Sequence, residues 1–367
     1  MGRRSARWAL VALVAAVACA VPSVVASLPV GGGRLGAVQL RAKIEASAAQ
    51  PYSGFARTQA ELGLPDLPAV GDVTSLLSGT TNIRVWYQTP DDNRVDVIDT
   101  VGERDVYQTP GGQFTWDYGT GLLTKILGAE PVRLPRAGDL LPPDLARRIL
   151  AMDPVDRPLA LPPRRIAGLA AEGLRLRPTD PETTVGQVDI WADPITGLPL
   201  RVEVTARGAT TPLITSQFVS VDRGSPDVSA LRPPDAGGQL ATAQAPDIVS
   251  AIAGFSRARL PRELAHYLLQ PQLPGLPGVG RYGAGLATFV VLPLPGNIGR
   301  PAIEAATKAG ATDVLVSRGR AVLIGIPLLG VLIGQVGRRT YLVAGFVSHG
   351  VLQEAANELS IGRLRSR

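Results

Sequence analysis

Apolar and polar residues alternate through residues 79–126, and the alternation predicts an antiparallel β-meander. Ile83, Val85 and Tyr87 fall on one side of an extended chain, and the residues between them fall on the other. Turn-forming sequences, such as Thr-Pro-Asp-Asp-Asn at 89–93, separate the apolar runs. We therefore expect a sheet with one exposed face and one face that is covered or holds a ligand.

Helical patterns flank the meander. Residues 37–49 combine helix-forming residues with a modest apolar stripe, and they precede a strand at 52–62. Residues 142–152 begin with two prolines, which suit a first helical turn, and place Leu145 and Ile149 on one face. Because this second helix lies between two sheet segments, it is a candidate lid over the sheet. Further strands of the same sheet are predicted at 164–169, 173–177, 186–192, 198–207 and 213–221.

The chain of 367 residues is long enough for two domains. We predict a main domain at 37–222, a Gly/Pro/Ala/Ser-rich linker at 223–246 and an α+β domain at 247–367. In the last domain the pattern predicts a short helix around His266. It also predicts strands at 286–292, 312–316, 321–326, 331–336 and 340–346, and helices at 299–309 and from Ser348.

Residues 1–33 have the pattern of an export segment. Three arginines precede an uncharged stretch that runs from Trp8 to Gly33. The stretch suits a signal peptide cleaved after Val24-Val25-Ala26, and it also exceeds the length that spans a bilayer. Basic residues at its start place the remaining chain outside the cytoplasm. The protein is therefore expected in the periplasm or cell envelope, either secreted or membrane-associated through an uncleaved anchor.

Composition excludes several classes of function. The net charge of +6 is scattered without runs of basic residues, so we expect no nucleic-acid partner. The only cysteine, Cys19, lies in the export segment, which leaves no disulfide in the exported part. His266 and His349 lack neighbours at metal-ligand spacing, so no metal site is predicted. The Gly278–Gly283 match to G-x-G-x-x-G lacks the preceding strand and following helix of a dinucleotide site, and no cofactor is predicted.

No nucleophile, elbow or phosphate-loop motif indicates catalysis, and we predict that the protein is not an enzyme. What remains is an apolar sheet face. Seven candidate ligand-binding residues come from the strands and from the inserted helix: Val85, Tyr87, Val97, Phe114, Trp116, Leu145 and Ile149. One interpretation is that they fill a core between the sheet and the helices. The other is that they line a half-open concave surface for an apolar ligand.

The segment VDIWADPITGLPLRVEV at 188–204 resembles a hairpin motif, W-x-D-x-x-T-G-L-P-L, of the LolA-like lipoprotein carriers and the related MucB/RseB regulators. Trp191, Asp193 and Thr196, followed by Gly197-Leu198-Pro199, carry the resemblance. RYGAGLATF at 281–289 is similar to the strand that opens the second domain of MucB/RseB-like proteins. The resemblance implies an α+β fold, with an antiparallel half-barrel, helices in its concavity and a smaller C-terminal α/β domain.

The resemblance also implies a function. The leading hypothesis is a lipid or lipoprotein carrier or sensor that holds an acyl chain against the concave sheet and regulates envelope signalling. The alternative is a regulator that docks a membrane-bound anti-sigma factor or transport complex and carries no lipid. The third hypothesis, which the resemblance does not imply, is an envelope enzyme acting through Asp189, Asp193 and Glu203.

Overall fold

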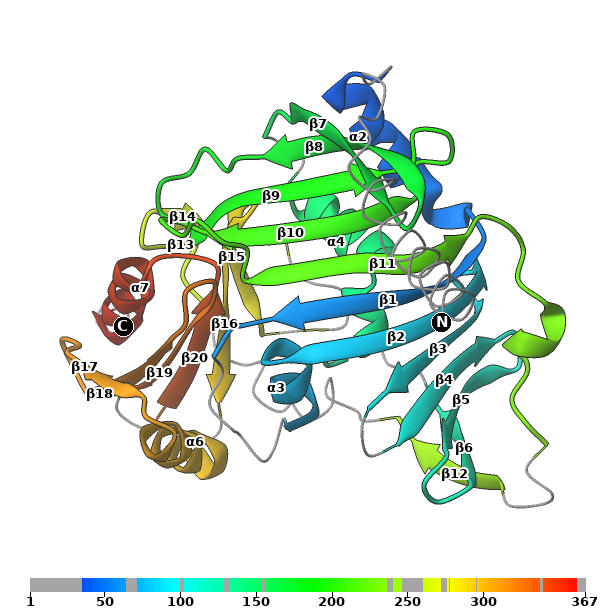
Figure 1. Ribbon diagram of the computed structural model, residues 1–367. Coiled ribbons are helices and arrows are strands. Elements are labelled where there is room, and N and C mark those ends of the chain that lie inside the picture. The colour runs from blue at the N-terminus through cyan, green and yellow to red at the C-terminus, as the bar shows by residue number, and fades with distance from the viewer. Residues whose placement is uncertain are drawn as a thin grey trace, which may run out of the picture.

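The described residues form two large sheets, one two-stranded hairpin and the helices that pack on the large sheets (Figure 1). The computed structural model describes residues 35–63, 71–99, 102–128, 133–153, 156–235, 240–245, 260–271, 276, 278–294, 296–336 and 339–361. A large curved sheet of twelve strands holds helices in its concavity, and a separate sheet of six antiparallel strands follows it. The α+β half-barrel with a smaller C-terminal α/β unit, expected from the sequence, is confirmed.

The large sheet is built from two meanders that meet at β1 and β11, in the order β12-β6-β5-β4-β3-β2-β1-β11-β10-β9-β8-β7. All neighbours are antiparallel except β12, which pairs with β6 in parallel. The predicted strands of this sheet are present with ends shifted by a few residues, except that the strand predicted at 164–169 includes the turn between β7 and β8, where Ala167 and Gly168 have positive φ. The strands are β1 (Tyr52–Ala60), β2 (Thr80–Thr89), β3 (Asp92–Ile98), β4 (Glu103–Thr109), β5 (Gly112–Asp117), β6 (Leu122–Leu127), β7 (Leu159–Ile166), β8 (Leu169–Leu176), β9 (Val185–Ala192), β10 (Pro199–Ala206), β11 (Ile214–Asp222) and β12 (Leu240–Gln244).

Two predicted helices fill one half of the concavity. Helix α2 (Ala37–Ala46), extended by the 3₁₀ turn η1 (Ser47–Ala49), packs with α4 (Pro142–Met152) against β8 to β10. Their buried residues Leu40, Ile44 and Leu150 share one core with inward-facing residues of those strands. Three short elements complete this part of the chain: α3 (Gly71–Leu77), η3 (Ala137–Leu140) and η4 (Val228–Leu231).

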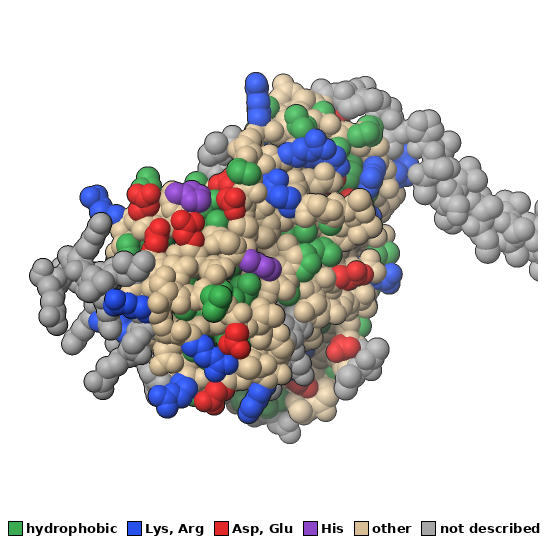
Figure 2. All heavy atoms as spheres, turned by 90° about the vertical axis from the view of Figure 1, so that its left-hand side faces the viewer, with side chains coloured by type: hydrophobic (Ala, Val, Ile, Leu, Met, Phe, Trp, Pro, Cys, Tyr) green, Lys and Arg blue, Asp and Glu red, His purple; other side chains and the backbone are tan. Residues whose placement is uncertain are grey.

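The six-stranded sheet has helices on both faces. Alternate residues of its strands face opposite ways, so Leu323 and Leu332 pack with α7 (His349–Ile361) whereas Val322 and Ile333 pack with α6 (Gly296–Lys308). The strand order is β15-β16-β20-β19-β18-β17. Their bounds are β15 (Gly280–Ala284), β16 (Ala287–Leu294), β17 (Thr312–Val314), β18 (Arg320–Gly325), β19 (Gly330–Val336) and β20 (Arg339–Gly345). On the outer surface over this part of the molecule, acidic side chains gather around one histidine (Figure 2).

One helix prediction is wrong. The helix expected around His266 is a tight hairpin of β13 (Glu263–Leu264) and β14 (Tyr267–Leu268), because Ala265 and His266 both adopt positive φ, at 47° and 61°. The segment predicted as a linker contains η4 and the edge strand β12. The glycine-rich match at 278–283 runs into strand β15, as expected for a turn that enters a strand.

The two sheets are joined by direct contacts. The Thr183 hydroxyl lies 2.7 Å from the Leu286 carbonyl and 2.8 Å from that of Phe346, and the Thr184 hydroxyl donates to the Leu328 carbonyl at 2.7 Å. Leu286, Ile326 and Leu328 also enter the core formed by α2, α4 and the large sheet. The export segment predicted at 1–33 lies outside the described residues. Within the described ranges, none of the helices combines the length and the apolar character needed to cross a bilayer.

Candidate functional site

The other half of the concavity is open. A cavity of about 1610 Å³ lies between the inner face of β2 to β6 and the segment 133–148, which includes η3 and the start of α4. The half over β8 to β10 is filled by α2 and α4. Among the described residues, the curved sheet therefore has a packed part and an open part, and the cavity lies in the open part.

An apolar row crosses the inner wall of the cavity. Cross-strand pairing places Val85 opposite Val95, Val95 opposite Val106, and Val106 opposite Thr115. Val97 lies beside this row, two residues along β3, and lines the same cavity. The wall changes from apolar on β2 and β3 to polar on β4 and β5, where Arg104, Gln108, Gln113, Thr115 and Asp117 face inward.

Tyr87 lies at the boundary between the open and the filled halves. Its ring stacks on that of Tyr52 with centroids 5.0 Å apart, and its hydroxyl donates to the Ala48 carbonyl at 2.6 Å. Burial raises the pKa of Tyr87. The residue is therefore a neutral hydrogen-bond donor that fixes η1 against the end of the cavity.

The two candidate residues from α4 belong to the packed half. Ile149 is buried in the core with α2, and Leu145 packs partly buried against the same core. Neither lines the cavity. The helix instead presents Asp144, Arg147 and Arg148 to it.

Phe114 and Trp116 do not share a face with Val85, and the expectation that they do is wrong. Phe114 pairs with Tyr107, and Trp116 pairs with Asp105, in a register that places all four on the outer face of the sheet. The period of two is present in β5, but its aromatic residues point away from the concavity. Thr115 points inward in their place.

The outer face of β2 to β5 carries a buried polar cluster. The Arg94 guanidinium donates to Asp96 at 2.7 Å and to Asp105 at 2.8 Å, and its centre lies 4.6 Å from the centroid of the Trp86 ring. The Tyr107 hydroxyl donates to Asp105 at 3.0 Å. Asp96 and Asp105 are fully buried, and one oxygen of each has no hydrogen-bond partner. Burial raises the pKa of Asp96 to about 7 and also raises that of Asp105.

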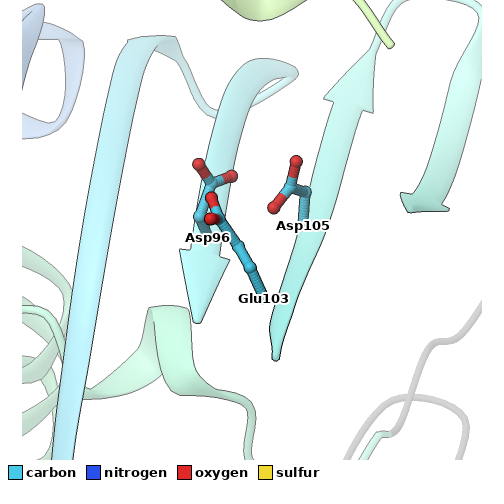
Figure 3. Close-up of side chains that lie close together, drawn as sticks. All are labelled: Asp96, Glu103 and Asp105. Atoms are coloured by element: carbon cyan, nitrogen blue, oxygen red, sulfur yellow. The ribbon is translucent and has the colours of Figure 1, made fainter. Parts of the chain in front are cut away.

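With Glu103, these aspartates form the group of side chains best placed to hold a metal among the described residues (Figure 3). One oxygen from each of Asp96, Glu103 and Asp105 lies within 4.8 Å of the others. Such oxygen ligands suit a hard cation. However, Arg94 already supplies a positive charge between the two aspartates, and their raised pKa values favour a bound proton.

The segment opposite the apolar row carries charge. Asp139 accepts two hydrogen bonds from Arg133, both at 2.7 Å, and one from Arg148 at 2.6 Å. Although burial favours the protonated form of Asp139, the hydrogen bonds from Arg133 and from the Arg136 backbone hold its pKa below the ordinary value. The Arg136 side chain donates to Gln113 at 3.0 Å and so bridges the segment to β5.

These charged residues were not among the sequence candidates. They lie in a proline-rich stretch without periodicity, so the pattern offers no face on which to place them. The only available signal was the density of arginine and aspartate between 133 and 148.

The hairpin motif at 191–199 has a structural role. Asp193 accepts from the Thr196 hydroxyl at 2.7 Å and from Arg223 at 3.1 Å, and Gly197 has a φ of 75°. Lys43 of α2 donates to the Pro194 carbonyl at 2.8 Å. The motif therefore ties the β9–β10 turn to α2 and positions the helix in the concavity.

Two acids of the enzyme hypothesis, Asp189 and Glu203, lie opposite each other on β9 and β10, whereas the third, Asp193, lies in the turn between these strands. Asp189 on β9 forms an ion pair with Arg175. Glu203 on β10 forms ion pairs with Arg201 and Arg164. Asp193 is held within its own turn. Their carboxylates are each engaged in a local ion pair or hydrogen bond, which explains their presence structurally.

The fold and site define a class of protein: a curved antiparallel sheet, half filled by helices and half open, joined to a smaller sheet. No family model matches the chain, and no curated protein matches it. Among solved structures, the chain is similar to MucB in complex with MucA(peri), at 16% identity and a TM-score of 0.48, over 87% of this chain and 97% of that chain. The Pseudomonas aeruginosa MucA/MucB complex matches at 17% identity and a TM-score of 0.48, with 87% and 96% covered.

A LolA superfamily protein from Nitrosomonas europaea matches at 13% identity and a TM-score of 0.24, over 54% of this chain and 98% of that chain. At these identities the likeness is one of fold.

Proposed function

We propose that the protein is a binding protein of the cell envelope that holds an acyl chain of a lipid or lipoprotein in the open half of its concave sheet. The observation that carries the proposal is the group of Val95, Val97 and Val106, which are only partly buried and line the cavity beside the buried Val85. Burying apolar surface of a ligand against such a row is favourable by roughly 25 cal/mol per Å².

The size of the cavity supports a ligand of lipid dimensions. Sites for small drug-like ligands measure about 300–1000 Å³, and this cavity measures about 1610 Å³. Its wall is apolar on β2 and β3 and polar toward β4 and β5, which suits an amphiphile better than a uniformly apolar molecule. The exported location predicted from residues 1–33 would place the protein where envelope lipids are available.

The division into domains at 37–222 and 247–367, with the linker at 223–246, is part of the same proposal. In it, the first domain binds the lipid, and the second relays the occupied state to envelope signalling. The contacts of Thr183 and Thr184 with the second sheet supply a physical connection between the two.

The second candidate function is the docking of a protein partner without a lipid. Inward-facing Gln108, Gln113 and Thr115 favour it, because amide and hydroxyl groups can hydrogen-bond an extended peptide. MucB, to which the fold is similar, has been solved in complex with MucA(peri). A partner of this anti-sigma-factor kind would occupy the same half of the concavity.

Filling the cavity tests the proposal. We predict that Val97→Trp lowers the lipid that co-purifies with the detergent-free protein by about tenfold, because the indole occupies the space beside the valine row. The measurement is organic extraction followed by mass spectrometry, with lipid expressed per protein chain. Val219→Trp is the matched control, since Val219 is exposed on the same sheet, and it should leave the lipid content unchanged.

Two results would contradict the lipid-binding function. One is a wild-type protein that is folded and free of lipid, both after purification and after incubation with vesicles. The other is equal lipid in the wild-type protein and Val97→Trp. A lipid-free protein that retains a stoichiometric protein partner from envelope extracts would favour the docking function.

A further inference from the structure

We infer that the ligand of this cavity is an anionic amphiphile, with its negatively charged headgroup, such as a phosphodiester, held by the arginines of segment 133–148. The inference rests on the proposed function and specifies the class of lipid. It follows from the unequal distribution of charge along the cavity wall.

The two ends of the cavity carry opposite charge. Segment 133–148 contributes four arginines and two aspartates to the lining: Arg133, Arg136, Arg147, Arg148, Asp139 and Asp144. The opposite end, formed by the far ends of β3 to β5, contributes two acids and one arginine: Asp99, Asp117 and Arg104. The Glu103 carboxylate lies with Asp96 and Asp105 on the outer face. A bound anion is therefore attracted to the first end and repelled from the second.

The basic and acidic ends of the cavity are farther apart than the length of one lipid headgroup. Gln113 begins the inward-facing row of β5 and bonds Arg136, whereas Asp117 ends the row. At the usual rise of a strand, these positions lie about 13 Å apart. The potential along the valine row therefore runs from positive to negative, which sets one orientation for a polar ligand.

The arginines are placed to accept an anion. Arg133 and Arg148 both bind Asp139, so one carboxylate is shared by two guanidinium groups, and each guanidinium has five N–H donors. The Arg148 side chain is 57% exposed and the Arg133 side chain is 32% exposed, whereas Asp139 is largely covered. A phosphate oxygen approaching from the cavity can reach N–H groups of the exposed Arg148 other than the one that Asp139 accepts.

The adjacent apolar row selects an amphiphile over a free anion. Gly138 of the same segment lies against the Val95 side chain, since a Cβ there would be 3.6 Å from it. The basic end therefore borders directly on the valine row. A molecule that joins a phosphate group to an alkyl chain satisfies both surfaces, whereas inorganic phosphate satisfies only the first.

The experiment compares lipids that differ only in headgroup. Detergent-free full-length protein is incubated with vesicles of dioleoylphosphatidylglycerol or dioleoylphosphatidylcholine and re-isolated by gel filtration, and bound lipid per chain is quantified. We expect about tenfold more bound phosphatidylglycerol than phosphatidylcholine. The variant Arg136→Gln/Arg148→Gln should reduce this ratio to about two or below, with phosphatidylcholine binding unchanged.

The matched control is Arg57→Gln/Arg84→Gln. This variant removes the same amount of positive charge, but from exposed positions on the outer face of β1 and β2. It should preserve the tenfold ratio of bound phosphatidylglycerol to phosphatidylcholine. Circular dichroism verifies that each variant is folded. Excess inorganic phosphate should displace little phosphatidylglycerol, because it cannot replace the alkyl chain.

The outcomes separate the inference from the function on which it rests. Equal binding of both lipids by the wild-type protein overturns the anionic preference and leaves lipid binding intact. If both double variants lower the ratio of bound phosphatidylglycerol to phosphatidylcholine equally, the headgroup site at segment 133–148 is also overturned, since net charge alone would then explain the preference. Displacement by inorganic phosphate would identify a free anion as the ligand and overturn the amphiphile assignment. Binding of neither lipid by the folded protein rejects the lipid-binding function itself.

Discussion

At the scale of single residues, the direction of a side chain decides its role more than its polarity does. The alternation in β2 and β3 correctly placed Val85, Tyr87 and Val97 on one face. It could not place Phe114, because the inward positions change from odd to even numbers between β3 and β4 and back to odd numbers between β4 and β5. Apolar character suggested the inside for Phe114, although on the outer face its ring lies beneath the ammonium group of Lys125.

The buried acid Asp96 predicts an unusual pH dependence. Burial raises its pKa to about 7 from an ordinary 3.8, so the native state retains a proton that the unfolded chain releases. This group's contribution to the free energy of unfolding is therefore complete below about pH 4 and is lost as the pH rises through 7. Asp96→Asn supplies a permanent amide donor in place of that proton.

We expect Asp96→Asn to be more stable than the wild-type protein at pH 8 by about 1–3 kcal/mol, with the difference shrinking toward pH 4. Urea unfolding at a series of pH values measures it. Asp313→Asn, at an exposed position, is the control and should match the wild-type protein throughout. A difference for Asp96→Asn that grows toward low pH would refute the assigned direction.

At the scale of elements, positive backbone φ angles separate turns from helices. The run RELAHYLL has helical composition but forms a hairpin, because its neighbours in the C-terminal core favour the pairing of Glu263–Leu264 with Tyr267–Leu268. Composition also predicted a plain linker at 223–246, where the structure has η4 and β12. The error at RELAHYLL arises because tertiary contacts override weak local preferences.

Gly283 tests how strongly one positive φ angle constrains the residue type. Gly283 has a φ of 89°, and a Cβ there would collide with the Ala287 carbonyl oxygen. We expect Gly283→Ala to lower the free energy of unfolding by about 2–3 kcal/mol, measured by chemical denaturation. Gly224→Ala is the control, because position 224 has open space around it and no positive φ. Equal stability of both variants would show that the β15–β16 turn relaxes.

At the scale of the whole molecule, the sequence predicted the two sheets but not how they are joined. Periodicity describes the strands one at a time, whereas the contacts of Thr183 and Thr184 connect residues more than a hundred positions apart. The shared core that includes Leu286 and Leu328 shows the same long-range character. Nothing in the local pattern around 180–184 distinguishes it from an ordinary loop.

This connection predicts cooperative unfolding. Thr183 is fully buried, and its hydroxyl contacts carbonyls of two C-terminal segments, so Thr183→Val leaves polar groups without a partner. We expect a loss of about 1–2 kcal/mol and a broader or divided calorimetric transition. Thr312→Val, within the six-stranded sheet alone, should leave the shape of the transition unchanged. A single sharp transition in Thr183→Val would mean that the apolar core alone couples the sheets.

The pairing of β1 with β11 has a consequence for the time the chain takes to fold. Each meander forms from neighbouring segments, but the seam between them joins residues 53–60 to residues 214–222. Closing so long a loop is slow compared with forming hairpins, because its entropy is lost before the new contacts compensate. An emerging chain would therefore hold one completed meander with an unpaired edge at β1 until residue 222 arrives, and during that interval the edge is open to pairing with other chains.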